Sequence, residues 1–482
     1  MTYDADAWSS AEEPSFTELY PTFAYLKQFK REEVEQMETL FHRARRFRKQ
    51  HIDPNTLKVD RKVMGDSTYV ANDVLEAACK AGIFGMMIPK MLGGEGFPFG
   101  ASMVAMEEIA VGCLGLGNLL GVHGLALCTV AATGDLAKMS HIAGMLARSE
   151  RKGRLRLLST AITEPTAGTD VEDVEFLKTA RLMCEAKPVQ GGYKLNGRKV
   201  FISNGSVAHT HVVIMSTDKT RAAETQWAFL VETGTPGFSI GRVEKKMGQK
   251  ACPAAELVFE DCFIPESARI GTRPVAGRSV DLVLGATRGA VGLWGAAAAR
   301  SAFQRALVYA KSHKLRGKWL IDHQWVQFKL TDMHRNAQMA RAMFMDASLS
   351  NEMFGLSSLM GGMQRAQQIQ NMIPKAVYDR INLPKLLDRP AVRERGRGAI
   401  DGISAYNANL SCAFGAAAKF SGTDLGMANA HLALDIMGAD GLRHDRGGEK
   451  VFRDAKLLQI YEGTNQLNRL EVFKRAIARN AA

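Results

Sequence analysis

The 482-residue sequence has few of the features of small secreted, fibrous or disordered proteins. Its seven cysteines form no C-x-x-C pair, which argues against a disulfide framework and a zinc site, so no metal is predicted. Only 14 residues are proline and 46% are hydrophobic, which excludes a collagen-like or disordered chain. No apolar run reaches about 18 residues, because even Ala101–Thr129 contains Glu107 and Glu108. A membrane span is therefore not expected.

The charge balance and the first residues narrow the function class further. The chain has 62 Lys and Arg against 50 Asp and Glu, and this net charge of +12 favours anionic partners without choosing among them. We expect no nucleic-acid partner, because the sequence contains no helix-turn-helix or aromatic RNA-binding signature. The acidic start, Met1–Phe16, has neither the plan of a secretory signal nor that of a transit peptide, so we expect a cytoplasmic protein.

Hydrophobic periodicity divides the chain into three regions. From about residue 29 to 147 the apolar residues recur every three or four positions, as in Val34, Met37 and Leu40, which predicts helices. From residue 159 to about 273, short runs rich in Val, Ile, Phe and Thr alternate with turn signals, which predicts an antiparallel β-domain. The helical period then returns for the final third of the chain.

These patterns predict an α+β protein. The basic run Arg393–Arg397 could meet an electron-transfer partner or a membrane surface, whereas as a solvated loop it needs no partner. It lies in an insertion that has three prolines and a glycine pair, and no role is predicted for that insertion. The predicted divisions are an N-terminal extension at 1–25, an N-terminal helical domain at 26–158, a central β-domain at 159–275, and a C-terminal helical bundle at 276–482 with the insertion at about 351–402.

The most informative single segment is Ala161-Ile-Thr-Glu-Pro-Thr-Ala-Gly-Thr-Asp170, a polar turn at the edge of the β-region. Its small hydroxyl residues and exposed amide groups suit the binding of an uncharged polar ring edge or a phosphate. A Thr- and Asp-rich capping loop would have the same composition. Taken alone, the segment leaves both interpretations open.

Three further segments follow this turn in order. They are Tyr193-Lys-Leu-Asn-Gly-Arg-Lys-Val-Phe-Ile-Ser-Asn-Gly205, then Lys246-Met-Gly-Gln-Lys250 with Leu257-Val-Phe-Glu-Asp-Cys-Phe-Ile-Pro265, and Arg453-Asp-Ala-Lys-Leu-Leu-Gln-Ile-Tyr-Glu-Gly-Thr-Asn-Gln466. With the turn, this quartet resembles the acyl-CoA dehydrogenase family over about residues 26–350 and 405–478. Four motifs in family order are far more specific than any one of them.

The resemblance implies an N-terminal helical domain, a β-domain and a C-terminal four-helix bundle that hold FAD in a homotetramer. It implies that Glu462 takes the α-proton of an acyl-CoA while the β-hydrogen leaves as hydride to flavin N5. The product would be a 2-enoyl-CoA, and the electrons would pass to an electron-transfer flavoprotein. Such a base must be desolvated, because an α-C–H is weakly acidic. Without the motif, Glu462 would be interpreted as an ordinary turn glutamate.

The resemblance also implies binding roles for residues of this sequence. For Arg288 and Gln324 a surface or capping role is an equally good interpretation. The implied cofactor contacts are Ile162, Thr163, Gly168, Thr169, Phe201, Ser203, Arg316, Gln324, Gly438, Thr464 and Gln466, and the implied substrate contacts are Thr169, Arg288, Tyr461 and Gly463.

Two stretches depart from the family's pattern. Many relatives have an Arg, then an aromatic residue and Gly, at the cofactor phosphate between subunits, whereas this chain has Ser312-His-Lys-Leu-Arg-Gly317. Arg316 would then supply the guanidinium for the phosphate. The glycine pair before the last motif is altered to Gly438-Ala-Asp-Gly441. Both changes lie where the resemblance places the FAD of the neighbouring subunit, so weaker or remodelled binding is expected there.

The acyl group is only partly constrained. Ala101–Ala131, which resembles the pocket-lining helix, contains no Lys or Arg, and this disfavours a dicarboxylic acyl chain. Its many glycines suit either a roomy pocket for a bulky, cyclic or aromatic acyl chain or close helix packing on small residues. Nearby in the β-region, His209-Thr-His211 is interpreted as a surface strand rather than a metal site.

Other functions remain open on the same fold. A decarboxylating or enoyl-reducing relative, or a flavin oxidase, would keep the site and change the chemistry. A non-catalytic family member acting in complex assembly would hold FAD weakly, although Glu462 argues against it.

Overall fold

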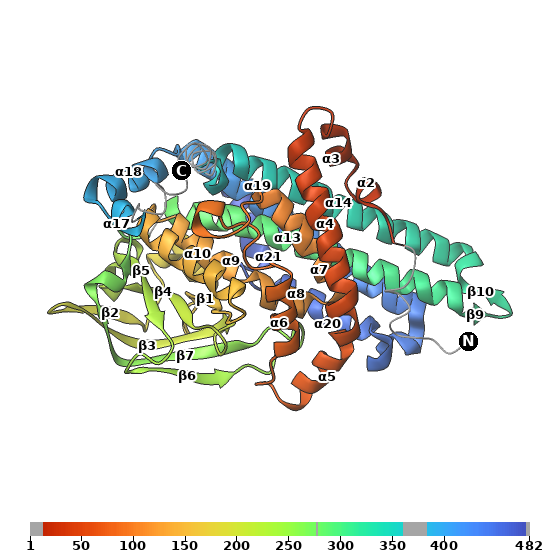
Figure 1. Cartoon of the computed structure of the whole chain (residues 1–482). Coiled ribbons are helices and arrows are strands. Elements are labelled where there is room, and N and C mark those ends of the chain that lie inside the picture. The colour runs from red at the N-terminus through yellow and green to blue at the C-terminus, as the bar shows by residue number, and fades with distance from the viewer. Residues whose placement is uncertain (1–12, 276–277, 360–382, 479–482) are drawn as a thin grey trace.

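The computed structural model describes residues 13–275, 278–359 and 383–478 of the chain. Figure 1 shows a β-sheet at one end of the molecule and long helices that extend from it to a small hairpin at the other end. Helices that precede the sheet in sequence pack against helices that follow it. The predicted order of a helical region, a sheet and a second helical region is confirmed.

The N-terminal helices follow the hydrophobic period. Val34 and Met37 are buried on one face of their helix, as predicted. Phe16 and Tyr20 are buried in the same core, so the predicted extension at 1–25 contributes to it. The helices are α2 (Phe16–Leu19), α3 (Pro21–Leu26), α4 (Arg31–Phe47), α5 (Thr56–Gly65), α6 (Asn72–Lys80), α7 (Phe99–Gly112), α8 (Leu114–Gly121), α9 (His123–Ala131) and α10 (Leu136–Arg151).

The central sheet is mixed, which corrects the prediction of an antiparallel β-domain. Most neighbouring strands are antiparallel, but β1 pairs with β4 in parallel and β2 meets β4 in parallel. Parallel pairing is possible because β1 leads into a long turn with helix α11 (Val174–Leu177), not into a tight hairpin. The strands are β1 (Leu158–Ala161), β2 (Glu185–Val189), β3 (Gly192–Ser203), β4 (Thr210–Ser216), β5 (Gln226–Glu232), β6 (Phe238–Val243), β7 (Ala254–Pro265) and β8 (Arg269–Ile270).

The interpretation of His209-Thr-His211 as a surface strand is wrong for His211. This side chain is completely buried, and its ring lies 2.7 Å from Ser159 Oγ and 2.9 Å from Thr233 Oγ1. Burial lowers the pKa of His211 to about 4, so the ring is neutral at physiological pH. The surface interpretation fails because β4 lies inside the sheet, with paired strands on both sides.

The C-terminal helices form the predicted bundle. Gly292 and Gly422 allow its two longest helices, α13 and α19, to approach closely, because a Cβ on Gly292 would collide with the backbone of Ala418 and a Cβ on Gly422 would collide with the backbone of Gly292. A hairpin of β9 (Lys314–Leu315) and β10 (Lys318–Trp319) joins two of the helices. The helices are α13 (Arg278–Ser312), α14 (Gln324–Phe354), α19 (Ala405–Met437), α20 (Gly448–Leu458) and α21 (Asn465–Val472).

Helix α7 is buried on almost every side, and arginines of the bundle neutralise its two glutamates. Glu107 Oε1 accepts a hydrogen bond from Arg341 Nη2 at 2.5 Å, and Glu108 Oε2 accepts one from Arg300 Nη1 at 2.6 Å. Burial opposes ionisation of Glu108, but Arg300 and its neighbours hold the pKa of this carboxyl well below its usual range. These pairs fix α7 against α13 and α14.

The predicted insertion at about 351–402 is described only in part, and residues 360–382 lie outside the described residues. The basic run Arg393–Arg397 belongs to a helix that begins at Pro390, which corrects its interpretation as a loop. Pro390 suits the first position of that helix, where its missing N–H costs nothing. The helices of this segment are α17 (Leu383–Leu387) and α18 (Pro390–Asp401).

Two helical stretches in the described part of the chain are long and apolar enough to cross a membrane by composition alone, at Leu114–Ala131 and Ser279–Ser312. Within the fold, 67% and 78% of their respective apolar windows are buried. Packing against neighbouring helices therefore accounts for their apolar composition.

Candidate active site

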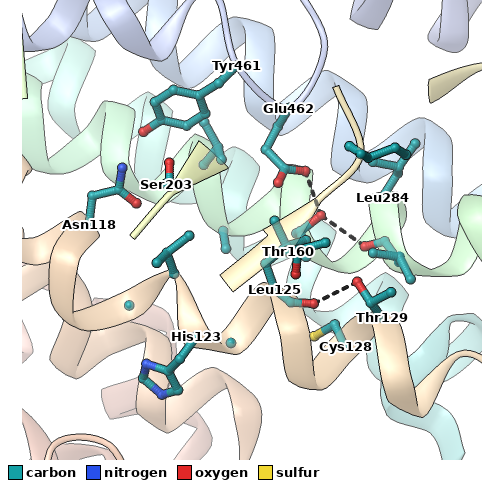
Figure 2. Close-up of a pocket in the computed structure, with 18 of the residues that line it drawn as sticks. Asn118, His123, Leu125, Cys128, Thr129, Thr160, Ser203, Leu284, Tyr461 and Glu462 are labelled. Carbon is teal, nitrogen blue, oxygen red and sulfur yellow. Dashed lines mark hydrogen bonds between the residues drawn. The ribbon is translucent and has the colours of Figure 1, made fainter. Parts of the chain in front are cut away.

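A cavity of about 240 Å³ lies where the three regions meet. Its walls come from α7, α8 and α9, from the ends of β1 and β3, from α13, and from the turn between α20 and α21. Figure 2 shows Asn118 and His123 on one side of it and Tyr461 and Glu462 on the other. Most lining residues are apolar. Among those that the structure describes, Glu172 and Glu462 are the acidic ones, and none is Lys or Arg.

Glu462 lies on a tight turn that several buried donors hold in place. Glu462 and Gly463 have positive φ angles of 54° and 75°, a conformation that costs energy for a residue with a side chain. Lys419 Nζ donates to the Gly463 carbonyl at 2.7 Å, and Arg288 Nε donates to the Glu462 carbonyl at 3.2 Å. Asn468 Nδ2 donates to both carbonyls. The surrounding contacts therefore determine where this carboxylate points.

The Glu462 carboxylate faces the cavity and has one close hydrogen-bond donor. Its Oε2 accepts from Thr287 Oγ1 at 2.8 Å (Figure 2). Burial raises the pKa of Glu462 above its ordinary value, although Thr287, Arg288 and Lys419 act in the opposite direction. A positioned, desolvated carboxylate with a raised pKa is suited to accept a proton from a carbon acid.

Glu172 is a second carboxylate in the cavity, and no sequence motif predicted it. It lies on the short 3-10 turn Thr169–Glu172, two residues beyond the quoted motif. Its Oε2 is 3.4 Å from Arg288 Nη2. Burial raises the pKa of Glu172 to about 7; Arg288 lowers it, and the charge of Glu462 adds to the rise. Only its position beside the motif could have drawn attention to it.

Arg288 is completely buried beneath the Glu462 turn, which does not support its predicted contact with substrate. Besides the Glu462 carbonyl and Glu172, it lies 4.0 Å from a carboxylate oxygen of Glu471. Its charge therefore serves these buried acids and the turn. The sequence of α13 has no clear apolar face, so its pattern does not show whether Arg288 faces the cavity or the buried acids.

The β-domain contributes one wall of the cavity, formed by Ile162, Thr163, Phe201 and Ser203 as the sequence motifs place them. The two segments of this wall are tied together. Lys199 Nζ donates to the Ile162 carbonyl and to Glu164 Oε1, each at 2.8 Å, and Val200 N donates to the Thr163 carbonyl at 3.0 Å. The motifs at 161–170 and 193–205 therefore form a single surface.

This wall has the chemistry that a flavin ring requires. Phe201 is 61% exposed and offers an apolar ring, while Thr163 and Ser203 offer hydroxyl groups. Thr160 Oγ1 is buried in the lining without a hydrogen-bond partner among the described residues. A flat ring system with a polar edge matches such a surface, since apolar contact and hydroxyl groups are both available.

Several predicted contacts lie outside the cavity. Gly168 and Thr169 belong to the outer part of the turn, and Gln466 is exposed on α21. The Thr464 hydroxyl accepts from Leu467 N at 3.2 Å and caps α21. The cofactor contacts proposed for these four residues stay predictions. Of the remaining substrate predictions, Tyr461 lines the cavity and Gly463 is buried behind it.

Arg316 and Gln324 flank strand β10, since Arg316 lies between β9 and β10 and Gln324 begins α14, and Gly438 directly follows the end of α19. Arg316 is at the hairpin tip with a φ of 52°, and all three residues are exposed. A contact with the cofactor of a neighbouring subunit is compatible with this exposure and stays a prediction.

The roomy-pocket interpretation of the glycines at 112, 115, 117, 121 and 124 is not supported. A Cβ at each of the first four positions would lie within 3.2 Å of a neighbouring residue, and only at Gly124 would it meet open space up to 4.0 Å. At Gly117 and Gly121 the neighbour is the indole ring of Trp294. The glycines are there because other groups occupy the space, so the alternative of close packing is confirmed.

One group of possible metal ligands is present among the described residues, at Asp60, His444 and Glu449. Arg453 lies among them, with Nη2 2.7 Å from Asp60 Oδ2 and 2.9 Å from Glu449 Oε1. The guanidinium already supplies the positive charge that these carboxylates need.

Comparison with known proteins agrees with this geometry. The sequence matches three family models in order: the acyl-CoA dehydrogenase N-terminal domain at residues 34–150, the middle domain at 159–262, and the C-terminal domain at 278–353 and 396–477. The residues between the two matched parts of the C-terminal domain, after 353 and before 396, lie inside the predicted insertion at about 351–402.

Curated relatives align over nearly the whole chain. An acryloyl-CoA reductase (NADH) from Anaerotignum propionicum is 26% identical over 94% of this chain and 100% of its own length. A short-chain specific acyl-CoA dehydrogenase from Clostridium acetobutylicum is 28% identical over 83% of this chain and 88% of its own length.

Solved structures share the fold. Butyryl-CoA dehydrogenase from Megasphaera elsdenii superposes with a TM-score of 0.68, at 24% identity over 91% of this chain and 97% of that one. The FAD complex of PigA superposes with a TM-score of 0.69, at 20% identity over 92% of this chain and 97% of that one. Because the three family models together match most of its length, the chain belongs to the acyl-CoA dehydrogenase family.

Proposed function

We propose that this protein oxidises an acyl-CoA to the 2-enoyl-CoA, with FAD as its cofactor and Glu462 as the base. The observation that carries this proposal is the Glu462 carboxylate, which is fixed by Thr287 in an apolar cavity beside the wall of Phe201 and Ser203. The family, and the PigA structure that contains FAD, support the choice of cofactor.

Each residue of the site has a task in this reaction. Glu462 accepts the α-proton of the thioester, and the apolar lining keeps water away from the carboxylate so that it remains basic. FAD, when bound, supplies the acceptor for the β-hydride. The residues that would hold its ring are Thr160, Ile162, Thr163, Phe201 and Ser203.

The assembly, the partners and the location belong to the same proposal. We expect a homotetramer in which Arg316, Gln324 and Gly438 meet the FAD of a neighbouring subunit, because all three residues are exposed. We expect an electron-transfer flavoprotein as the electron acceptor and a cytoplasmic location. Analytical ultracentrifugation of the purified protein would test the tetramer directly.

The experiment that tests the function is anaerobic titration of the purified flavoprotein with saturated acyl-CoAs, read from the visible flavin band. Bleaching by a thioester, but not by free CoA at the same concentration, is the expected result. A yellow protein that no saturated thioester bleaches would contradict the proposal. A colourless protein that FAD cannot reconstitute would favour the non-catalytic assembly role.

The enoyl-reducing direction is the second candidate, because one relative is named an acryloyl-CoA reductase. For that direction, flavin reduced chemically in the absence of thioester should be reoxidised rapidly by a 2-enoyl-CoA. Comparing this rate with the rate of bleaching by the saturated thioester shows which direction the site favours.

Replacing Glu172 with glutamine should change the pH dependence of flavin reduction. As pH rises through about 7, Glu172 loses its proton, and its negative charge makes Glu462 a stronger base. We therefore expect the wild-type rate to rise a few-fold across this range, more steeply than the rate of Glu172→Gln, in which only Glu462 remains to titrate. Stopped-flow bleaching between pH 6 and 8 measures both. Glu175→Gln, at an exposed carboxylate on the next turn, is the control and should keep the wild-type profile.

A further inference from the structure

Part of the cavity lining comes from helices alone, and we call this part, formed by the residues named in this paragraph, the inner branch. Along α13, Thr287, Val291 and Trp294 line the cavity at spacings of four and three residues, which places them on one face of the helix. Opposite them lie Met106 of α7 and Gly121 of α8. No residue of the proposed flavin wall belongs to this branch, so it is available to the acyl chain.

The branch begins at the base and ends at an indole ring. Thr287 holds the Glu462 carboxylate, and Trp294 lies seven residues further along the same helix. At 1.5 Å per residue, the two are separated by about 10 Å along the helix axis. An extended chain advances about 1.25 Å per carbon, so an acyl chain whose α-carbon contacts Glu462 has room for about five further carbons before it makes van der Waals contact with the ring.

The Trp294 ring packs against two glycines of α8, Gly117 and Gly121, where a side chain would collide with it. A Cβ on Gly117 would lie 2.6 Å from the indole Cζ3, and a Cβ on Gly121 would lie 3.1 Å from Cζ2. Neither glycine has a positive φ, so a larger residue could adopt the helical backbone at both positions. The two glycines therefore form a slot for the ring, which is half-buried and borders the cavity.

We propose that Trp294 closes the acyl-binding branch and makes short-chain, uncharged acyl thioesters the substrate class. The inference rests on the proposed function, because it requires that Glu462 act on a thioester in this cavity. None of the described lining residues is Lys or Arg, so a charged group at the end of the acyl chain would have no partner in the cavity. The apolar walls favour a hydrocarbon tail.

The test compares Trp294→Ala with the wild type on butyryl-, hexanoyl-, octanoyl- and decanoyl-CoA. Each carbon that fits or fails to fit an apolar pocket changes discrimination by roughly tenfold or more. The wild type should be bleached faster by butyryl- and hexanoyl-CoA than by octanoyl- and decanoyl-CoA, and the variant should gain at least about tenfold in the ratio of octanoyl to butyryl rates. Anaerobic calorimetric titration with the same thioesters in the Glu462→Gln background, where flavin reduction is expected to be about a thousandfold slower, should show the same shift in affinity.

Two controls separate the shape of the branch from general damage. Phe303→Ala removes an aromatic ring from the same helix outside the cavity, where it packs on His334, and should keep the wild-type chain preference. Adding Gly121→Leu to Trp294→Ala refills the slot and should restore the preference for short chains. If Trp294→Ala does not fold, Trp294→Leu enlarges the branch by a smaller amount and should shift the preference in the same direction.

The outcomes distinguish this inference from the proposed function. If thioesters bleach the wild-type flavin but Trp294→Ala and Trp294→Leu keep the wild-type chain profile, Trp294 does not limit the chain, and the inference is overturned while the function stands. A wild type that prefers octanoyl- or decanoyl-CoA would overturn it as well. If no thioester bleaches or binds to the wild type, the proposed function itself fails.

Discussion

Glu462→Gln should reduce the rate of flavin bleaching by a saturated acyl-CoA about a thousandfold, within the range that a positioned base contributes to proton transfer. Glutamine has nearly the same shape and can still accept a hydrogen bond from Thr287, but it cannot take up the α-proton at neutral pH. The turn should remain intact, because Arg288 and Lys419 bind its backbone carbonyls rather than the side chain. Anaerobic stopped-flow absorbance measures the rate.

The flavin spectrum provides the control for this variant. Glu462→Gln should purify with the same flavin content as the wild type, and Glu266→Gln, at an exposed carboxylate in the β-domain, should keep wild-type rates. Bleaching of Glu462→Gln at the wild-type rate would remove Glu462 from the mechanism. Loss of the flavin would instead mean that the turn positions the cofactor.

Sequence patterns predicted the order of the elements and several of the residues that line the cavity. Glu462, Tyr461, Phe201 and Ser203 occupy its walls as their motifs imply, because each motif is a short stretch whose local backbone places the side chain. The parallel pairing of β1 with β4, which makes the sheet mixed, was not predicted. Strand direction in a sheet depends on how distant segments meet, and alternation along one strand does not encode this.

The supporting residues of the site were missed for a similar reason. Lys419 is completely buried and lies 2.7 Å from the Gly463 carbonyl, although a lysine in a helical pattern is usually interpreted as a surface residue. Trp294 fills the space beside Gly117 from a different domain, so the glycines suggested an empty pocket when taken alone. In both cases the function of a residue depends on a partner far away in the sequence.

Arg288→Met should destabilise the protein by about 3–5 kcal/mol, because it leaves the buried Glu172 without its ion-pair partner and removes a donor to the Glu462 carbonyl. Arg288 is the cation 3.4 Å from Glu172 and 4.0 Å from Glu471, and it also donates to the Glu462 carbonyl. Flavin reduction should slow as well, since the turn loses one of its backbone anchors. Urea unfolding, followed by circular dichroism with flavin present, measures the change in the free energy of unfolding.

A second substitution tests whether the stranded carboxylate is the cause. Glu172→Gln in the Arg288→Met background removes one of the uncompensated charges and should recover about 1–2 kcal/mol of the loss, since neighbouring substitutions that share a partner are not additive. Glu471 keeps Arg475 as a partner in both variants, so recovery can be assigned to Glu172. A double variant no more stable than Arg288→Met would show that the arginine stabilises the fold through the Glu462 turn and not by neutralising Glu172.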